Sequence, residues 1–324
     1  MAPIPGTCEQ KALDMRTLIC GSLAYDTIMV FKDRFKNHLL PDQLHILNVA
    51  FLVPDMRREF GGCAGNIAYG MKLLGADPVI MATVGDDFEP YSARLRALGL
   101  LSPYVKPIRG TYTAQAFITT DLDDNQITAF HPGAMNHSHE NDAALADAAL
   151  AIIAPDGREG MLAHARQLSA RGIPFMFDPG QGLPMFNGEE LMAFIRRAAY
   201  VTVNDYEARL LQERTGEKIE DLARNVKAFI VTLGGKGSVI YHDGREIVIP
   251  CAQAEQVLDP TGCGDAYRAG LLYGIGRELD WEVTGRIASL MGAIKVARRG
   301  AQNHTTDPDG LRHAFRNHFG FDMD

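Results

Sequence analysis

The chain has 324 residues, of which 46% are hydrophobic and 22% charged, and its formal net charge is −8. This composition is typical of a globular protein with a sizeable core, and the length permits one large α/β domain or two smaller ones. The negative charge argues against a nucleic-acid partner, and the lack of a long apolar run or a signal peptide argues against a membrane partner or secretion. Five scattered cysteines fit neither a disulfide framework nor a zinc site, so we expect a cytoplasmic protein.

Short apolar runs alternate with helical patterns along most of the chain. Residues 1–14 contain Pro3, Pro5 and Gly6 without periodicity, and we expect a flexible N-terminal extension with Met15 as the natural start. A strand is expected over 17–21, and a helix follows residues 61–66 and stops at Gly75. Further strands are expected over 79–84, 151–153, 175–177, 200–203 and 229–233. Strands that alternate with helices predict a mainly parallel sheet covered on both faces.

Two stretches break this alternation. Residues 28–58 hold no clear helix, and residues 111–131 have the pattern of a hairpin with strands over 116–120 and 127–130. We expect both insertions at one edge of the sheet, where they would form a small β-sheet lid. A lid of this kind would be useful over a site whose reaction must be kept from water. The alternative is a pair of surface hairpins without a function.

Residues 259–265 read Asp-Pro-Thr-Gly-Cys-Gly-Asp, and Asp265 opens a helix that continues through Tyr273. Glycines before a helix let backbone N–H groups turn toward a ligand, and the helix dipole favours a phosphate there. Asp265 would lie where a base could take a proton from an attacking hydroxyl, as in a phosphotransferase. Taken alone, the segment is equally consistent with a structural role, in which Asp265 only caps the helix and the glycines only turn the chain.

From Thr17 to Asn303 the chain resembles the ribokinase-like (phosphofructokinase B type) family of carbohydrate and nucleoside kinases. Four motifs carry the resemblance: residues 259–265, Gly61-Gly62 with Asn66, Asn204-x-x-Glu207, and the glycine-rich turn over 232–237. Pro260 and Cys263 stand where the family commonly has Thr and Ala, and neither removes an N–H group from residues 262–264. Residues 60–69, 178–184 and 259–274 are most similar to the bacterial nucleoside kinases that act on adenosine and other purine nucleosides.

This resemblance implies a three-layer α/β/α sandwich with a mainly parallel central sheet and a small β-sheet lid, in one kinase domain over 15–324. It implies transfer of the γ-phosphate of ATP to the 5′-hydroxyl of a purine nucleoside, with adenosine, inosine and guanosine left open. The implied partners are the nucleoside and ATP, and the implied state is a monomer or a homodimer.

The resemblance also assigns roles to single residues. Asp265 would be the general base, and the N–H groups of Gly262, Cys263 and Gly264 would hold the charge on the transferred group. Asp26 would accept hydrogen bonds from two ribose hydroxyls, although a turn aspartate is the plainer interpretation. The other expected substrate-binding residues are Gly62, Asn66, Gln115, Phe117 and Phe130.

The remaining motifs concern ATP and metal ions. Asn204 and Glu207 would act on Mg²⁺ through water, and the same spacing is a helix capping box. Asp259 and Thr261, with carbonyl groups around Ala297 and Gly300, resemble the monovalent-cation site of some family members, which implies activation by K⁺. The expected ATP-binding residues are Asn204, Thr232, Gly234, Gly237 and Asn303.

Three rival functions follow from the same pattern. A ribokinase- or fructokinase-type sugar kinase would share the chemistry, but Met29, Phe31, Phe117 and Phe130 favour an apolar slot for a base. A dinucleotide-binding oxidoreductase would need Gly-x-Gly-x-x-Gly after the first strand, and this sequence lacks it there. A non-catalytic binding relative is disfavoured by the presence of Asp265.

Overall fold

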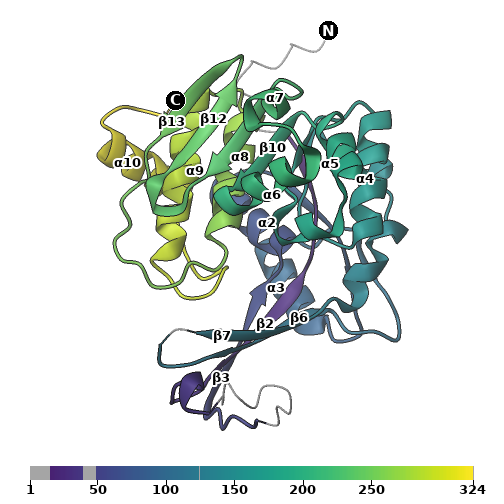
Figure 1. The fold of residues 1–324 in the computed structure, drawn as a ribbon, viewed down its shortest axis with the longest axis vertical. Helices are drawn as coiled ribbons and strands as arrows, with labels where there is room; N and C mark the ends of the chain where they lie inside the picture. The colour runs from purple at the N-terminus through teal and green to yellow at the C-terminus, as the bar shows by residue number, and fades with distance from the viewer. Residues whose placement is uncertain (1–14, 39–48, 124, 324) are drawn as a thin grey trace, which may run out of the picture.

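The computed structural model describes residues 15–38, 49–123 and 125–323, so the expected extension over 1–14 lies outside the described residues. The chain forms a large body from which a small sheet projects (Figure 1). The strands are β1 Thr17–Cys20, β2 Ala24–Val30, β3 Asp55–Gly61, β4 Pro78–Val84, β5 Val105–Pro107, β6 Ala114–Thr120, β7 Gln126–His131, β8 Leu150–Ile153, β9 Phe175–Phe177, β10 Tyr200–Asn204, β11 Ala228–Thr232, β12 Ser238–His242 and β13 Arg245–Ile249.

Helices connect most of these strands. The α-helices are α2 Cys63–Leu73, α3 Glu89–Leu98, α4 Arg158–Ala170, α5 Gly188–Ile195, α6 Asp205–Thr215, α7 Ile219–Ala223, α8 Cys263–Gly276, α9 Trp281–Val296 and α10 Pro308–Phe319. Short 3₁₀ helices are η1 Phe35–Asn37, η3 Gly133–Glu140, η4 Ala143–Leu145, η5 Gly180–Met185 and η6 Gly234–Lys236. No described helix is long and apolar enough to cross a membrane.

The body is built on a sheet of nine strands in the order β13-β12-β11-β10-β9-β8-β1-β4-β5. Neighbouring strands from β5 to β11 run parallel, and only β12 and β13 are antiparallel to their neighbours. Every strand expected from an apolar run is present, because strands covered on both faces need apolar side chains on both. The mainly parallel sheet is therefore confirmed.

Helices cover both faces of this sheet, because successive side chains of a strand point to opposite sides. In β8, Ile152 packs into a core with α2, α3 and α8, whereas Ala151 and Ile153 pack into a second core with α4, α5, α6 and α7. All three side chains are fully buried. The structure confirms the predicted three-layer α/β/α sandwich.

A separate sheet of four strands has the order β3-β2-β6-β7. The expected hairpin is confirmed as β6 and β7, and β2 pairs in parallel with β6 and antiparallel with β3. Its strands start and end slightly outside the expected 28–58 stretch, of which residues 39–48 lie outside the description. The register places Asp26 beside Glu59 and Ala116, and Ala116 opposite Phe130, so these side chains share one face.

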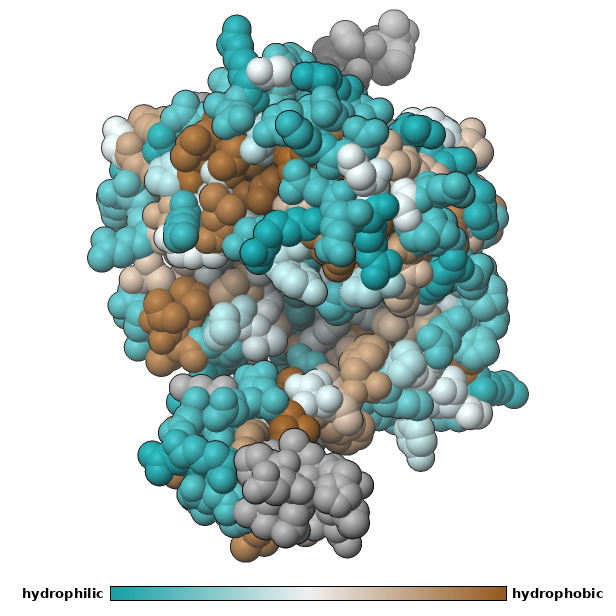
Figure 2. All heavy atoms as spheres, in the orientation of Figure 1, coloured by the Kyte–Doolittle hydropathy of each residue, from teal (hydrophilic) through white to brown (hydrophobic). Residues whose placement is uncertain are grey.

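The carboxyl ends of the central strands and the first turns of α2, α6 and α8 meet at one edge of the large sheet. This edge faces the small sheet, and the space-filling view shows a hollow between the two (Figure 2). Open parallel sheets bind their ligands at this edge. The fold thereby brings the distant sequence motifs to one place.

Candidate active site

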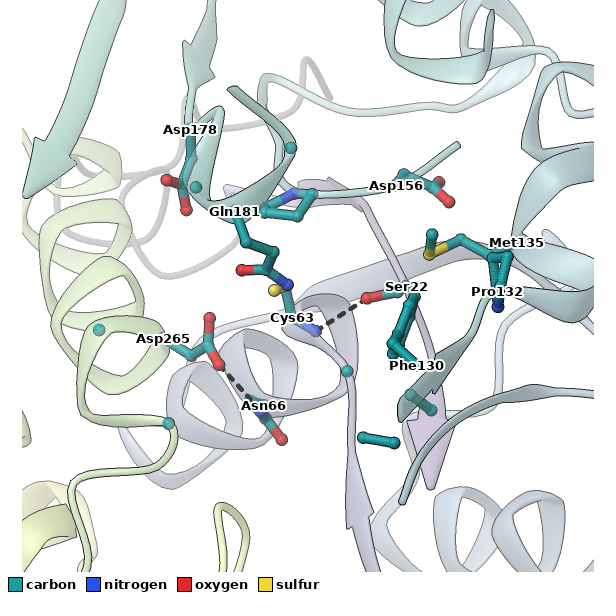
Figure 3. A pocket seen from close by; sticks show the side chains of 18 of the residues that line it. Ser22, Cys63, Asn66, Phe130, Pro132, Met135, Asp156, Asp178, Gln181 and Asp265 are labelled. Carbon is teal, nitrogen blue, oxygen red and sulfur yellow. Dashed lines mark hydrogen bonds between the residues drawn. The ribbon is translucent and has the colours of Figure 1, made fainter. Parts of the chain in front are cut away.

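A cavity of about 680 Å³ lies at this edge, between the body and the small sheet. Asp265, Asn66 and Asp178 lie on one side, and the apolar side chains of Phe130, Pro132 and Met135 lie on the other, with the carboxylate of Asp156 close by (Figure 3). The other lining residues are Ser22, Ala24, Asp26, Gly62, Cys63, Ala116, Asn136, Pro155, Gly157, Arg158, Gly180, Gln181, Gly182, Met185, Asn204, Glu207, Thr261, Gly262, Gly264 and Arg268. The two sides suit a ligand with one polar and one flat apolar part.

The first turn of α8 faces the cavity. Its N-cap is Gly262 at a φ of 79°, and no described side chain caps the helix. A Cβ at this position would lie 2.8 Å from the Cβ of Ala301, so the turn requires glycine. The N–H groups of Gly262 and Gly264 make no hydrogen bond within the described residues, which leaves them free for an anion.

Cys263 departs from its expected role in this turn. Its N–H group donates to the carbonyl of Pro260 at 3.1 Å, and Cys263 does not line the cavity. Because the N–H group of Cys263 is used in this hydrogen bond within the turn, it is not directed at a ligand. The expected anion site is thus reduced to Gly262 and Gly264.

Asp265 lies in the first turn of α8, two residues after the helix begins, and does not cap it. Its Oδ2 accepts a hydrogen bond from Nδ2 of Asn66 at 2.8 Å, and Oδ1 of Asn66 accepts in turn from Nε2 of Gln302 at 3.0 Å. Burial raises the pKa of Asp265 to about 6, although Asn66 and the nearby Arg268 oppose the rise. A fixed, half-buried carboxylate with this pKa suits a general base.

Asp26 lies on β2 and points into the cavity from the small sheet. A Cβ at position 61 would lie 2.4 Å from its Oδ2, so Gly61 is needed beside this carboxylate. Gly62 has a φ of 86°, and a Cβ there would lie 2.5 Å from the carbonyl oxygen of Ser22. Burial raises the pKa of Asp26 to about 6, and the charges of Asp259 and Glu59 add to the rise.

The structure separates the three residues expected from the hairpin. Phe130 lines the cavity, together with Ala116 opposite it on β6. Gln115 and Phe117 are the neighbours of Ala116 along the strand, so their side chains point to the other face. Nε2 of Gln115 donates to Asp87 at 2.9 Å, and neither Gln115 nor Phe117 lines the cavity. Met29 and Phe31, expected near the base, also lie outside its lining.

Asn204 and Glu207 form the capping box of α6 and also line the cavity. Oδ1 of Asn204 accepts from the N–H of Glu207 at 2.8 Å, and Oε2 of Glu207 accepts from the N–H of Asn204 at 2.8 Å. Burial raises the pKa of Glu207, and the charge of Asp178 raises it further. The capping interpretation holds, and both side chains still face the ligand space.

The remaining residues expected to bind ATP lie outside the cavity lining. Gly234 and Gly237 shape the turn around η6 with φ values of 57° and 89°. A Cβ at Gly237 would lie 2.1 Å from the carbonyl oxygen of Ile249, so the turn itself needs this glycine. Asn303 donates to Glu59 at 3.0 Å and to the carbonyl of Arg299 at 2.9 Å. Thr232 ends β11 next to Asn204 on β10.

A buried ion pair lies behind Asp265. Arg268 donates through Nε and Nη2 to the two oxygens of Asp178, at 3.0 and 2.9 Å. Only 7% of the Arg268 side chain and 3% of the Asp178 side chain are exposed. This two-bond geometry fixes both groups and places a positive charge at the cavity wall.

Asp259 and Thr261 stabilise the turn before α8. The carboxylate of Asp259 accepts from the N–H of Thr261 at 2.9 Å and from the N–H of Gly300 at 2.8 Å. Burial alone would raise the pKa of Asp259, but these hydrogen bonds lower it. The ammonium group of Lys295 lowers it further. The carbonyl of Asp259, one of the oxygens expected near a monovalent cation, accepts from Nζ of Lys295 at 2.7 Å.

Several residues of the site were not predicted from the sequence. Arg268 follows Asp265 by three positions, the spacing of neighbours on one helix face, and this spacing could have indicated it. Asp156 lines the cavity after β8, and burial raises its pKa to about 8. Its Oδ2 has no hydrogen-bond partner among the described residues. Pro132 and Met135 come from a stretch without a motif.

Comparisons with known proteins show the family of the chain. Residues 29–308 match the pfkB family carbohydrate kinases. A nucleoside kinase of Methanocaldococcus jannaschii is 34% identical over 259 residues, which cover 79% of this chain and 85% of that protein. The structure of Burkholderia thailandensis nucleoside kinase in complex with inosine is 52% identical, with a TM-score of 0.87 over 94% of this chain and 99% of that chain. Its complex with ADP-inosine is 54% identical, with a TM-score of 0.84 over 94% and 97% of the two chains.

The buried ion pair gives a prediction about stability. Replacing Arg268→Met leaves Asp178 charged, buried and unpaired, so we expect the free energy of unfolding to fall by about 3–5 kcal/mol. The double variant Arg268→Met/Asp178→Asn removes both charges and should recover part of the loss. Urea unfolding followed by circular dichroism measures both.

The control is Arg224→Met, which breaks the exposed pair with Asp221, where 76% and 44% of the side chains are accessible. An exposed pair is worth about 1 kcal/mol or less, so this variant should remain close to the unmodified protein. An equal loss in the single and double variants at Arg268 would contradict the buried-charge explanation.

Proposed function

Because the chain belongs to the pfkB family of carbohydrate kinases, we propose that it transfers the γ-phosphate of ATP to the 5′-hydroxyl of a purine nucleoside. The observation that carries the proposal is the position of Asp265. Its half-buried carboxylate lies in the cavity beside the uncapped start of α8, so a base and an anion site adjoin each other.

Asp265 accepts the proton of the 5′-hydroxyl as that oxygen attacks the γ-phosphorus. The N–H groups of Gly262 and Gly264 stabilise the charge on the transferred phosphoryl group, and the positive end of the α8 dipole adds to this. The new bond joins the 5′-oxygen to phosphorus, the bond to the β-phosphate oxygen breaks, and ADP leaves. Asn66 holds the carboxylate of Asp265 in position through the 2.8 Å hydrogen bond.

The charges of the cavity support a requirement for Mg²⁺. Carboxylates outnumber the two arginines of its lining, and one arginine, Arg268, already pairs with Asp178. A triphosphate would enter a negative environment, so its charge needs a counter-ion. The described residues hold no group of three or more His, Cys, Asp or Glu side chains that could bind a metal by itself. Magnesium would take most ligands from phosphates and water, with Asn204 and Glu207 beyond that water.

The shape of the cavity favours a nucleoside over a free sugar. Asp26 and Asn66 would meet the ribose hydroxyls close to Asp265, while Phe130, Pro132 and Met135 provide an apolar slot for a base (Figure 3). A volume of about 680 Å³ exceeds what a single sugar ring needs and is usual for larger ligands. The kinase of Burkholderia thailandensis has been solved with inosine, which supports a purine nucleoside as the acceptor.

Two further features belong to the proposal. The free thiols of Cys20, Cys63, Cys251 and Cys263 suit a reducing cytoplasm, where ATP is available. The four-stranded sheet would act as the lid. Its edge strand β7 is exposed along its length and offers a pairing surface if the protein is a homodimer rather than a monomer.

The proposed activity is tested by measuring ATP consumption with adenosine, inosine, guanosine, cytidine, ribose and fructose as acceptors in the presence of Mg²⁺. We expect turnover with the purine nucleosides, because a nucleoside reaches both sides of the cavity whereas a free sugar reaches only one. Activity confined to the free sugars would replace the proposal by a sugar kinase. A folded protein without activity on any of them would indicate a binding relative.

The role of Asp265 is tested by the variant Asp265→Asn, which keeps the shape of the side chain and removes the base. We expect kcat to fall by about 10²–10⁴-fold, with little change in KM or melting temperature. Asp309→Asn, an exposed carboxylate in the first turn of α10, is the matched control and should leave turnover unchanged. Near-normal turnover of Asp265→Asn would rule it out as the base.

The pH dependence follows from the same carboxylate. Asp265 acts only when ionised, and its pKa is raised to about 6, so kcat/KM should be level well above pH 6 and fall as the pH drops through 6. Asp26 also titrates near 6. If both must be ionised, the acidic limb falls with two protons and becomes a one-proton limb in Asp26→Asn. A limb centred near the ordinary aspartate pKa of about 4 would contradict this.

A further inference from the structure

Lys295 is buried completely near the end of α9, with 0% of the residue exposed. Its Nζ donates to the carbonyl of Asp259 at 2.7 Å and to the carbonyl of Arg298 at 3.2 Å. A buried ammonium group is stable only when oxygens and a negative charge surround it. Burial lowers the pKa of Lys295, and the carboxylate of Asp259 opposes that shift.

The ammonium group holds the backbone that leads into α8. The N–H of Asp259 donates to the carbonyl of Val296 at 3.2 Å, next to Lys295. Together with the bonds from Thr261 and Gly300 to the Asp259 carboxylate, this ties the turn over 259–262 to the end of α9. Gly262, the N-cap of the proposed anion site, is the last residue of that turn.

Several of the oxygens that would hold a monovalent cation already accept hydrogen bonds. Asp259 and Arg298 offer their carbonyls to Lys295, and the carbonyl of Ala297 accepts from Nη1 of Arg298 at 2.9 Å and from Nε2 of Gln256 at 3.3 Å. A second positive charge beside the ammonium group would be repelled strongly in this low-dielectric interior. The residues present therefore do not fit the K⁺ site that the family resemblance implied.

We propose that the ammonium group of Lys295 takes the place of a dissolved monovalent cation and holds the turn over 259–262 in the shape that the anion site needs. Lys295 is thus a positioning residue, and turnover does not depend on K⁺. The effect on turnover rests on the proposed kinase function, whereas the effect on the turn does not.

The first test compares the unmodified protein in K⁺, Na⁺ and tetramethylammonium chloride at constant ionic strength. We expect the same turnover and the same melting temperature in all three salts. Activation by K⁺ over tetramethylammonium would overturn the proposal.

The second test removes the ammonium group with Lys295→Ala, which opens a space lined by the carbonyls of Asp259 and Arg298. In tetramethylammonium we expect kcat to fall about 100-fold, because the anion site is displaced while substrate binding is less affected. K⁺ should restore most of that turnover and raise the melting temperature of the variant. Full turnover of Lys295→Ala without K⁺ would overturn the proposal.

Lys295→Met is the matched control. It fills the space with an apolar side chain of similar length, so it should lose turnover without any rescue by K⁺. Equal rescue of the Met and Ala variants would mean that K⁺ acts elsewhere, against the proposal. The exposed Lys218→Ala should behave like the unmodified protein.

The melting temperature tests this inference separately from the proposed function. If no acceptor is phosphorylated, the K⁺-dependent melting temperature of Lys295→Ala still decides the inference. A rise in K⁺ supports it, and the absence of a rise overturns it. If Lys295→Ala does not fold in tetramethylammonium, folding in K⁺ supports the proposal, and failure in both salts overturns it.

Discussion

The open start of α8 is the constraint on which the rest of the site depends. Gly262 takes the N-cap position, so backbone donors that a side chain would otherwise satisfy face the cavity. A helix end of this kind is favourable only when an anion or water meets it. The turn therefore needs support from behind, and the Asp259 carboxylate and the end of α9 supply it.

Charge balance in the cavity follows from that constraint. Under the proposed function, Asp265 would lie close to an arriving phosphate, which is itself negative, and burial already disfavours the ionised form of Asp265. Three neighbours reduce this conflict. Asn66 donates a hydrogen bond to the Asp265 carboxylate, Gln302 holds the amide of Asn66 in place, and Arg268 supplies a positive charge nearby. Two hydrogen bonds to Asp178 hold the guanidinium group of Arg268 in place, so it does not form a direct ion pair with Asp265. The site is thus fixed before any ligand arrives, which is the main protein contribution to phosphoryl transfer.

The sequence predicted the parts of this structure that depend on local pattern. Parallel strands such as β8 and β10 appear as apolar runs because both of their faces are buried, whereas the partly exposed hairpin of β12 and β13 has no such signal. Asp265 and Asn66 could be identified because each sits in a short motif. Arg268 and Lys295 were not predicted, because their roles depend on hydrogen-bond partners that lie 90 and 36 residues away in the sequence. Phe117 was chosen alongside Phe130 because only the strand register tells which face each occupies.

The position of Asp26 on β2 has a consequence for how the γ-phosphate of ATP would be enclosed. β2 belongs to the small sheet, yet it follows β1 after residues 21–23, so Asp26 lines the cavity from the small sheet while Asn66 and Asp265 line it from the large body. Under the proposed function, an acceptor that contacts all three residues would bridge the small sheet and the large body. Under the proposed function, the acceptor itself would therefore complete the enclosure around the γ-phosphate. When nucleoside is scarce that enclosure would stay incomplete, so the protection of ATP would depend on the acceptor.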